Sequence, residues 1–162
     1  AQQRFAAEEK DAYLACIADV GDVNDIHPCR KWEVGVRLAA LAFQHVYGLP
    51  VRADAPIAVS AQLVAPGQVK VSLKNGRGLY RWMSEVSLWT ERQQESSPIR
   101  FEGADGKVVD CDSVISNDCI YATSDKILNP KSVTYMRQCT DEGNIYNDST
   151  LPLGTFRLSV EK

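Results

Sequence analysis

The hydrophobic pattern changes twice within the first fifty residues, from helix to strand and back to helix. Residues 1–10 are rich in Ala, Gln and Glu and contain no Gly or Pro, which is typical of the end of a helix. The run from Asp11 to Val20 is apolar with little polar alternation, and this predicts a strand covered on both faces, as in a parallel sheet. A loop from Gly21 to His27 follows, and Pro28 suits the first position of the next helix.

A longer helix is predicted from Arg30 to Tyr47, where Gly48 and Pro50 end the pattern. One strand, one loop and one helix form a βα unit, which cannot cover its own apolar faces. The remaining strands of the sheet must therefore come from another segment. The apolar residues of this helix follow the spacing i, i+4 and i+7 and are Val34, Leu38 and Leu41. Its narrow polar stripe consists of Glu33, Arg37 and Gln44.

Beyond Pro50 the pattern becomes that of a β domain, so we place a domain boundary near residues 49–55 and predict two domains, 1–50 and 51–162. Short β-prone runs are separated by turn signals such as Asn75-Gly76 and Asn117-Asp118. This spacing predicts an antiparallel β-sandwich or jelly roll. The irregular segment 144–157 is expected to fold against the N-terminal part. The β-prone runs are Ile57–Val64, Gln68–Leu73, Trp82–Trp89, Ile99–Phe101, Lys107–Val114, Cys119–Thr123 and Ser132–Arg137.

Composition and charge narrow the possible functions. With 44% hydrophobic and 24% charged residues, the 162-residue chain has the composition of a folded domain rather than a disordered one. A net charge of −3 gives no support for binding to nucleic acid or to an anionic membrane. No apolar run reaches the length of a membrane-spanning helix.

The cysteines and one glycosylation pattern favour an exported protein. No two of the five cysteines stand as C-x-x-C, so a zinc ribbon is disfavoured, and the odd count leaves at least one thiol free or paired to another chain. Asn147-Asp148-Ser149 matches the pattern of an N-glycosylation acceptor. The first ten residues do not form a signal peptide. Either a processed chain or a fragment would begin in this way. We expect a secreted, periplasmic or lysosomal location.

The segment from Gly21 to Phe43, GDVNDIHPCRKWEVGVRLAALAF, carries a family resemblance. It resembles the C-terminal part of the sialate O-acetylesterases in the SGNH hydrolase superfamily. Members carry a similar GD-x-NDIHP-x-x-K segment, followed by E-V-G-x-R-L-A and a helix that ends in VYG. Gly143 to Arg157 is similar to the closing segment of the family, and Phe101 to Lys107 is similar to a family hairpin. The likeness spans nearly the whole chain.

This resemblance implies the removal of O-acetyl groups from sialic acids or related acetylated sugars, without a metal or cofactor. In the family a serine in a GQSN-type segment attacks the acetyl carbonyl, and a histidine takes the proton of the serine. That segment has no counterpart in this chain. The resemblance therefore implies the last βα unit of an SGNH hydrolase sheet followed by a β-sandwich, which needs an N-terminal segment or partner chain carrying the serine. The serines of this chain stand in β-prone or turn segments and include Ser60, Ser72, Ser84, Ser87, Ser113 and Ser116.

The candidate general base is His27, on a loop between the predicted strand and helix. Many members of the superfamily have Asp three positions before this histidine, where Asn24 stands here. We choose Asp25 as the acid partner of His27, with Asp22 second, because a carboxylate near Nδ1 would stabilise the imidazolium. The alternative interpretations are that His27 is a surface residue that caps the helix, and that Asp22 and Asp25 only shape the turn.

Other candidate residues have simpler interpretations. His45 stands late in the predicted helix, where a charged imidazole favours the helix dipole. Cys29 and His27 alone do not make a metal site. Four aromatic residues could stack on sugars but are more often core residues or cross-strand pairs. The alternative function is a non-catalytic carbohydrate-binding or structural β-sandwich module. The four aromatic residues are Tyr80, Trp82, Trp89 and Tyr146.

Overall fold

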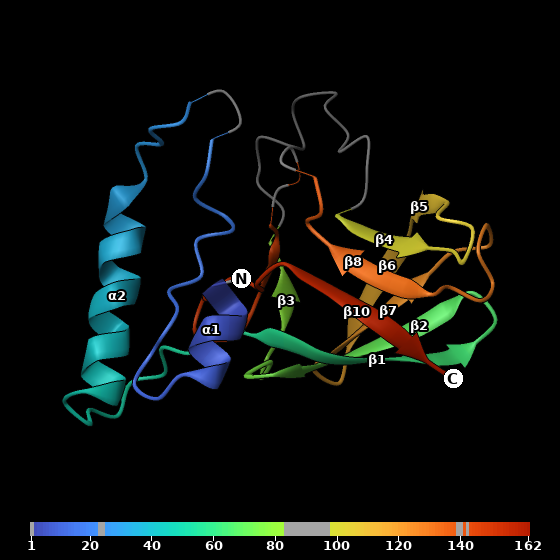
Figure 1. Cartoon of the computed structure of the whole chain (residues 1–162). Helices are drawn as coiled ribbons and strands as arrows, with labels where there is room; N and C mark the ends of the chain where they lie inside the picture. Colours follow the sequence, from blue (N-terminus) through green and yellow to red (C-terminus); the bar gives the residue numbers. More distant parts are fainter. Residues whose placement is uncertain (1, 23–24, 83–97, 139–140, 142) are drawn as a thin grey trace.

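The computed structural model describes residues 2–22, 25–82, 98–138, 141 and 143–162, and it is mainly β (Figure 1). Two helices and an extended segment occupy one side, and the strands occupy the other. The helices are α1 (Gln2–Glu8) and α2 (Lys31–His45). The strands are β1 (Ile57–Ala65), β2 (Gln68–Lys74), β3 (Tyr80–Arg81), β4 (Ile99–Glu102), β5 (Val108–Asp110), β6 (Asp112–Ser116), β7 (Cys119–Thr123), β8 (Ser132–Tyr135), β9 (Ile145–Tyr146) and β10 (Phe156–Glu161).

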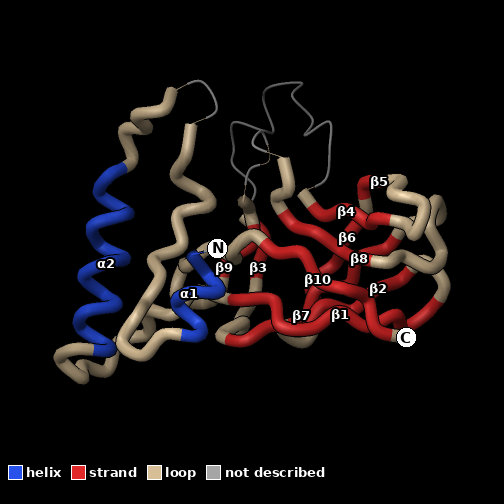
Figure 2. Tube along the Cα trace, in the orientation of Figure 1, coloured by secondary structure: helices blue, strands red, loops and turns tan. Residues whose placement is uncertain are grey.

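Eight of these strands form one mixed sheet in the order β5-β4-β8-β10-β1-β2-β7-β6, which is nearly closed like a barrel (Figure 2). The neighbouring strands pair antiparallel, except that β1 and β10 run parallel, with Ala61 opposite Val160. The β6–β7 hairpin turns on Asn117 and Asp118, whose φ angles of 50° and 56° are those of a type I′ turn. Strands β3 and β9 form a separate two-stranded sheet.

The core lies between the two halves of this sheet, β6-β7-β2-β1 and β10-β8-β4-β5. Alternate residues of the strands point inward, as the period-2 pattern of a strand requires. Val69 and Val71 of β2 are fully buried, as are Ile99 and Phe101 of β4. The other members of the core cluster include Ala61, Ile120, Ala122, Val133, Tyr135, Ile145 and Leu153.

Most of the strands predicted after residue 55 are confirmed, and the predicted topology is wrong in one feature. Five β-prone runs correspond to β1, β2, β4, β7 and β8, and the run 107–114 is divided into β5 and β6 at Cys111. The run Trp82–Trp89 lies outside the described residues beyond Trp82. No strand was expected at β10, although β10 joins the two halves. Its parallel pairing with β1 makes the sheet mixed, in place of the predicted antiparallel sandwich.

The N-terminal βα unit is confirmed in its helix and wrong in its strand. Helix α2 lies within the predicted range, whereas residues 11–20 form no strand and run as a loop beside α2 (Figure 2). A strand needs a neighbour for its backbone N–H and C=O groups, and no described residue forms a ladder with this segment. No helix in the described part of the chain is long and apolar enough to cross a membrane.

The predicted polar stripe of α2 lies on the inner side of the helix. Arg37 is only 9% exposed, and Glu33 and Gln44 are partly buried. Gln44 donates to Asp54 Oδ2 at 2.6 Å and accepts from the backbone N–H of Ala53. These bonds join the end of α2 to the linker that leads into β1. The expected boundary near residues 49–55 stays a prediction.

Segment 144–157 folds against the N-terminal part, as expected. The Tyr146 hydroxyl donates to Asp19 Oδ2 at 3.2 Å, and Arg52 pairs with Asp148 at 2.9 Å. Tyr135 of β8 holds the base of this segment, because its hydroxyl accepts the backbone N–H of Asn144 at 3.0 Å. Burial raises the pKa of Tyr135 to about 12.

Candidate functional site

The His27 loop joins the extended segment 11–20 to α2, and its histidine is exposed. The backbone N–H of His27 donates to Asp25 Oδ1 at 2.7 Å, which is an Asx turn. Residues 21–28 form no regular element where they are described, and α2 begins at Lys31. The N-cap position belongs to Arg30, so His27 does not cap the helix. Its imidazole therefore faces solvent at the edge of the N-terminal part.

The structure does not bring the Asp25 carboxylate to the His27 ring. Asp25 shapes the turn by accepting the backbone N–H of His27. The His27 imidazole forms no hydrogen bond with any described residue. Asp22 is exposed, and Asn24 lies outside the described residues. The roles of His27 as base and Asp25 as its partner stay predictions. The turn-shaping interpretation accounts for the contact that Asp25 makes here.

Asp19 anchors the base of this loop through a buried ion pair that sequence analysis missed. Arg37 of α2 donates to both carboxylate oxygens of Asp19, at 2.7 and 2.8 Å, and to the Cys16 carbonyl at 2.9 Å. Burial alone would lower the pKa of Arg37, but the hydrogen bonds and the charge of Asp19 raise it. Arg30 binds the backbone carbonyl of Asp19 at 2.9 Å. With Tyr146 on the same carboxylate, Asp19 links the loop, α2 and β9.

A second histidine, His45, makes the contact with a carboxylate that was expected of His27. His45 Nε2 lies 2.9 Å from Asp54 Oδ1, and the ring stacks on Tyr13 with centroids 3.9 Å apart. The sequence signal for this pair was weak, because Asp54 stands nine residues away across a turn. Since the pair joins the end of α2 to the linker, we interpret it as structural.

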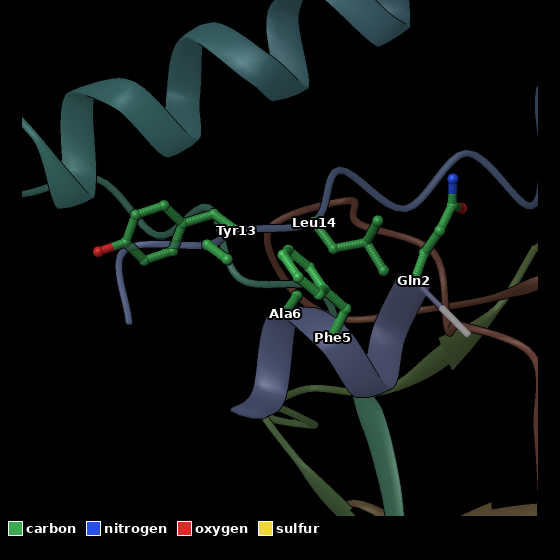
Figure 3. A pocket seen from close by; sticks show the side chains of 6 residues that line it. Gln2, Phe5, Ala6, Tyr13 and Leu14 are labelled. Atoms are coloured by element: carbon green, nitrogen blue, oxygen red, sulfur yellow. The ribbon is translucent and has the colours of Figure 1, made fainter. Parts of the chain in front are cut away.

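Two cavities lie near α1 and the extended segment. The smaller, about 460 Å³, is lined mainly by apolar side chains, with Phe5 and Ala6 of α1 facing Leu14 and Tyr13 nearby (Figure 3). The larger, about 1120 Å³, extends along segment 11–18 to His45 and residues 134–137 and 154–157. Neither cavity is lined by His27 or by a serine. Neither of these two cavities therefore brings His27 and a serine together.

The serines of the chain are not placed beside His27 in the described structure. Ser60, Ser72, Ser113 and Ser116 lie on strands β1, β2 and β6, and Ser113 Oγ accepts a hydrogen bond from Arg81 at 2.5 Å. Ser84 and Ser87 lie outside the described residues. A nucleophile for His27 is thus not identified among the described serines.

The other candidate residues have structural surroundings. Tyr80 and Tyr146 face each other across β3 and β9 with ring centroids 5.7 Å apart, which confirms the cross-strand interpretation. Trp82 is exposed, and Trp89 lies outside the described residues. The described part of the chain contains no group of three or more His, Cys, Asp or Glu placed to hold a metal.

The glycosylation pattern at Asn147 does not mark an accessible site in this fold. The side chain is 4% exposed, and Nδ2 donates to the carbonyls of Asn75 and Asp54 at 3.1 and 3.4 Å. Its Oδ1 accepts the backbone N–H groups of Ser149 and Leu151, each at 3.1 Å. Asn147 therefore organises the turn after β9.

The cysteines in the described part of the chain are all free thiols. Burial in the core raises the pKa of the Cys111 thiol to about 12, which favours its protonated form. The other three are Cys16, Cys29 and Cys119.

Comparison with solved structures shows a likeness to a known protein. No protein-family model matches the chain, and no curated protein sequence matches it. A crystal structure described as that of a novel carbohydrate acetylesterase from Xanthomonas citri superimposes with a TM-score of 0.71 and 27% sequence identity. The match covers 87% of this chain and 31% of that chain. The chain resembles part of a carbohydrate acetylesterase.

Proposed function

We propose that this chain is the C-terminal portion of a serine esterase that removes O-acetyl groups from sialic acids or related acetylated sugars. The observation that carries the proposal is the structural likeness to a carbohydrate acetylesterase over 87% of the chain. The resemblance of the Gly21–Phe43 segment to sialate O-acetylesterases also supports it. The chain spans 31% of that acetylesterase, so the remaining part of the catalytic machinery is assigned to polypeptide outside residues 1–162.

In this proposal His27 acts as the general base for a serine on that other polypeptide. The imidazole takes the proton of the serine hydroxyl while the serine oxygen attacks the acetyl carbonyl carbon. The tetrahedral intermediate collapses to acetyl-serine, and the imidazolium returns the proton to the leaving sugar oxygen. Water, activated by the same imidazole, then releases acetate and restores the serine. The oxyanion donors also belong to the outside polypeptide.

The solvent-facing position of His27 supports a site completed by another segment. A base must lie within hydrogen-bond reach of the proton that it removes, and an exposed ring at the edge of the N-terminal part is open to such an approach. Asp25 is the proposed acid partner. Its carboxylate would have to turn from the backbone N–H of His27 towards Nδ1 when the site is complete.

The proposal is tested by the hydrolysis of p-nitrophenyl acetate and of an O-acetylated sialic acid. Both are assayed with the 162-residue chain and with the complete protein that includes any upstream coding sequence. We expect the chain alone to release acetate no faster than the uncatalysed background, because it lacks the GQSN-type serine segment. The complete protein is expected to hydrolyse both esters. Esterase activity of the chain alone, or an inactive complete protein, would contradict the proposal.

A further inference from the structure

The exposed side of α2 carries an unbroken apolar row. Its members, together called the outer stripe, are separated by four, three, four and three residues, which is the spacing of a helix-packing seam. Trp32 is 80% exposed and Val46 is 70% exposed, although both are large and apolar. No charged residue lies among them. The outer stripe consists of Trp32, Val36, Ala39, Phe43 and Val46.

Helix α2 departs from the usual pattern of a surface helix, because large apolar residues lie on its exposed side while Arg37 is buried beside Leu41 on its inner side. A surface helix normally turns its apolar side to the core and its charges to water. Here Arg37 and Gln44 point inward to Asp19 and Asp54, while the outer stripe faces solvent. Gly35 lies beside the stripe, and a Cβ added there would meet no atom within 4 Å. A helix arranged in this way is suited to burial on both sides.

The neighbouring segment 11–20 has the same property. Its apolar pattern is that of a strand covered on both faces, but in the described structure it has no strand partner. Tyr13 and Ile17 are 42% and 50% exposed. The hydrogen bonds to two of its carbonyls come from the side chains of Arg37 and Arg30 and not from a neighbouring strand. In Figure 1 segment 11–20 runs between α2 and the other elements, and α2 lies at the outer side of the molecule, away from the sheet.

We infer that the outer stripe of α2 is the docking surface for the serine-bearing α/β portion of the same esterase. The inference rests on the proposed function. The occupant is indicated by the structural comparison, because the match leaves most of the acetylesterase without a counterpart in this chain. An α/β portion also supplies what the outer stripe lacks, namely an apolar helix or sheet face that covers it. Docking there brings a second polypeptide to the side of the molecule that carries the His27 loop.

The inference is tested by cysteine labelling of the complete protein. Val36→Cys places a thiol on the outer stripe, and Val114→Cys places a matched thiol on β6, where valine is 66% exposed. Both variants are treated with a maleimide. Mass spectrometry of peptides then follows the modification at each introduced cysteine and distinguishes it from modification of the native cysteines. We expect labelling at position 36 to be roughly tenfold or more slower than at 114, because it requires a local opening. In the isolated 162-residue chain the two sites should react at similar rates.

Light scattering of the same sample identifies the occupant. Slow labelling of position 36 in a monomeric complete protein, or in a complex of this chain with the serine-bearing chain, supports the inference. Equal labelling at 36 and 114 overturns it, and so does protection that is found only in a dimer of this chain. Labelling does not depend on hydrolysis. A failure of the docking surface is therefore distinguishable from a failure of the proposed activity.

Discussion

Asp19 is the residue through which segment 11–20, helix α2 and strand β9 are connected. Its side chain is 3% exposed and accepts two hydrogen bonds from Arg37 and one from Tyr146. A buried guanidinium is tolerated only when it is paired, since removing one partner leaves an uncompensated charge. The position of the His27 loop therefore depends on this carboxylate, which stands only eight residues before His27.

We predict that Asp19→Ala destabilises the chain by roughly 3–5 kcal/mol, because Arg37 would keep its buried charge without a partner. The free energy of unfolding in urea, followed by circular dichroism, measures the effect. Glu8→Ala is the matched control, since it removes one partner of the exposed pair Arg4–Glu8 and should cost about 0–1 kcal/mol. Similar losses for the two variants would show that Asp19 is not the connection that we describe.

The residues of the site could be predicted from the sequence only where a local motif carries them. His27 and Asp25 were found because they stand within eight consecutive residues that resemble a family segment. The Arg37–Asp19 pair was missed, since its partners are 18 positions apart and Arg37 fits a polar helix stripe equally well. The Asp25 carboxylate shows a second limit: its spacing from His27 is compatible with binding either the ring or the backbone N–H.

Strand β10 is the element that converts two groups of strands into one sheet. It lies between β8, to which it is antiparallel, and β1, to which it is parallel. Phe156, Leu158 and Val160 pack partly buried against the core. Without β10 the two halves of the sheet would share the core cluster but no hydrogen-bonded strand pair.

We predict that a chain ending at Thr155 loses cooperative unfolding. Each large core side chain removed costs roughly 2–5 kcal/mol, and the total stability of a domain is about 5–15 kcal/mol. Thermal unfolding followed by near-ultraviolet circular dichroism measures the change. Deletion of residues 1–8 serves as control, because α1 has no buried residue and its loss should leave the transition of the sheet in place. A sharp transition in the chain without β10 would refute the role assigned to this strand.

Elements were predictable where short-range patterns decide them and not where pairing does. The Asn117-Asp118 turn and the alternation of β2 and β7 are local properties, and they were identified correctly. The parallel pairing of β10 with β1 joins residues about a hundred positions apart, which no local pattern specifies. Segment 11–20 illustrates the converse. Its sequence carries the pattern of a buried strand, but the described chain provides no neighbour to pair with it.

On the scale of the whole molecule, the chain combines an eight-stranded sheet with an N-terminal part whose helix α2 exposes large apolar side chains. The sheet has a continuous buried core between its two halves. The N-terminal part has an apolar outer stripe, an extended segment that belongs to no sheet of the described residues, and an exposed histidine loop. Together with the likeness to part of a carbohydrate acetylesterase, these features support the proposal that the chain is one portion of a larger esterase.

The central claim is that His27 is the general base of that site, and its replacement in the complete protein tests the claim most directly. The measurement is kcat/KM for p-nitrophenyl acetate in His27→Ala, compared with His45→Ala, which removes the structural histidine paired with Asp54. We predict a loss of roughly 10²–10⁴-fold or more for His27→Ala with an unchanged unfolding transition. His45→Ala should keep its kcat/KM within a few-fold of the unmodified protein. An active His27→Ala protein, or equal losses in both variants, would contradict the account.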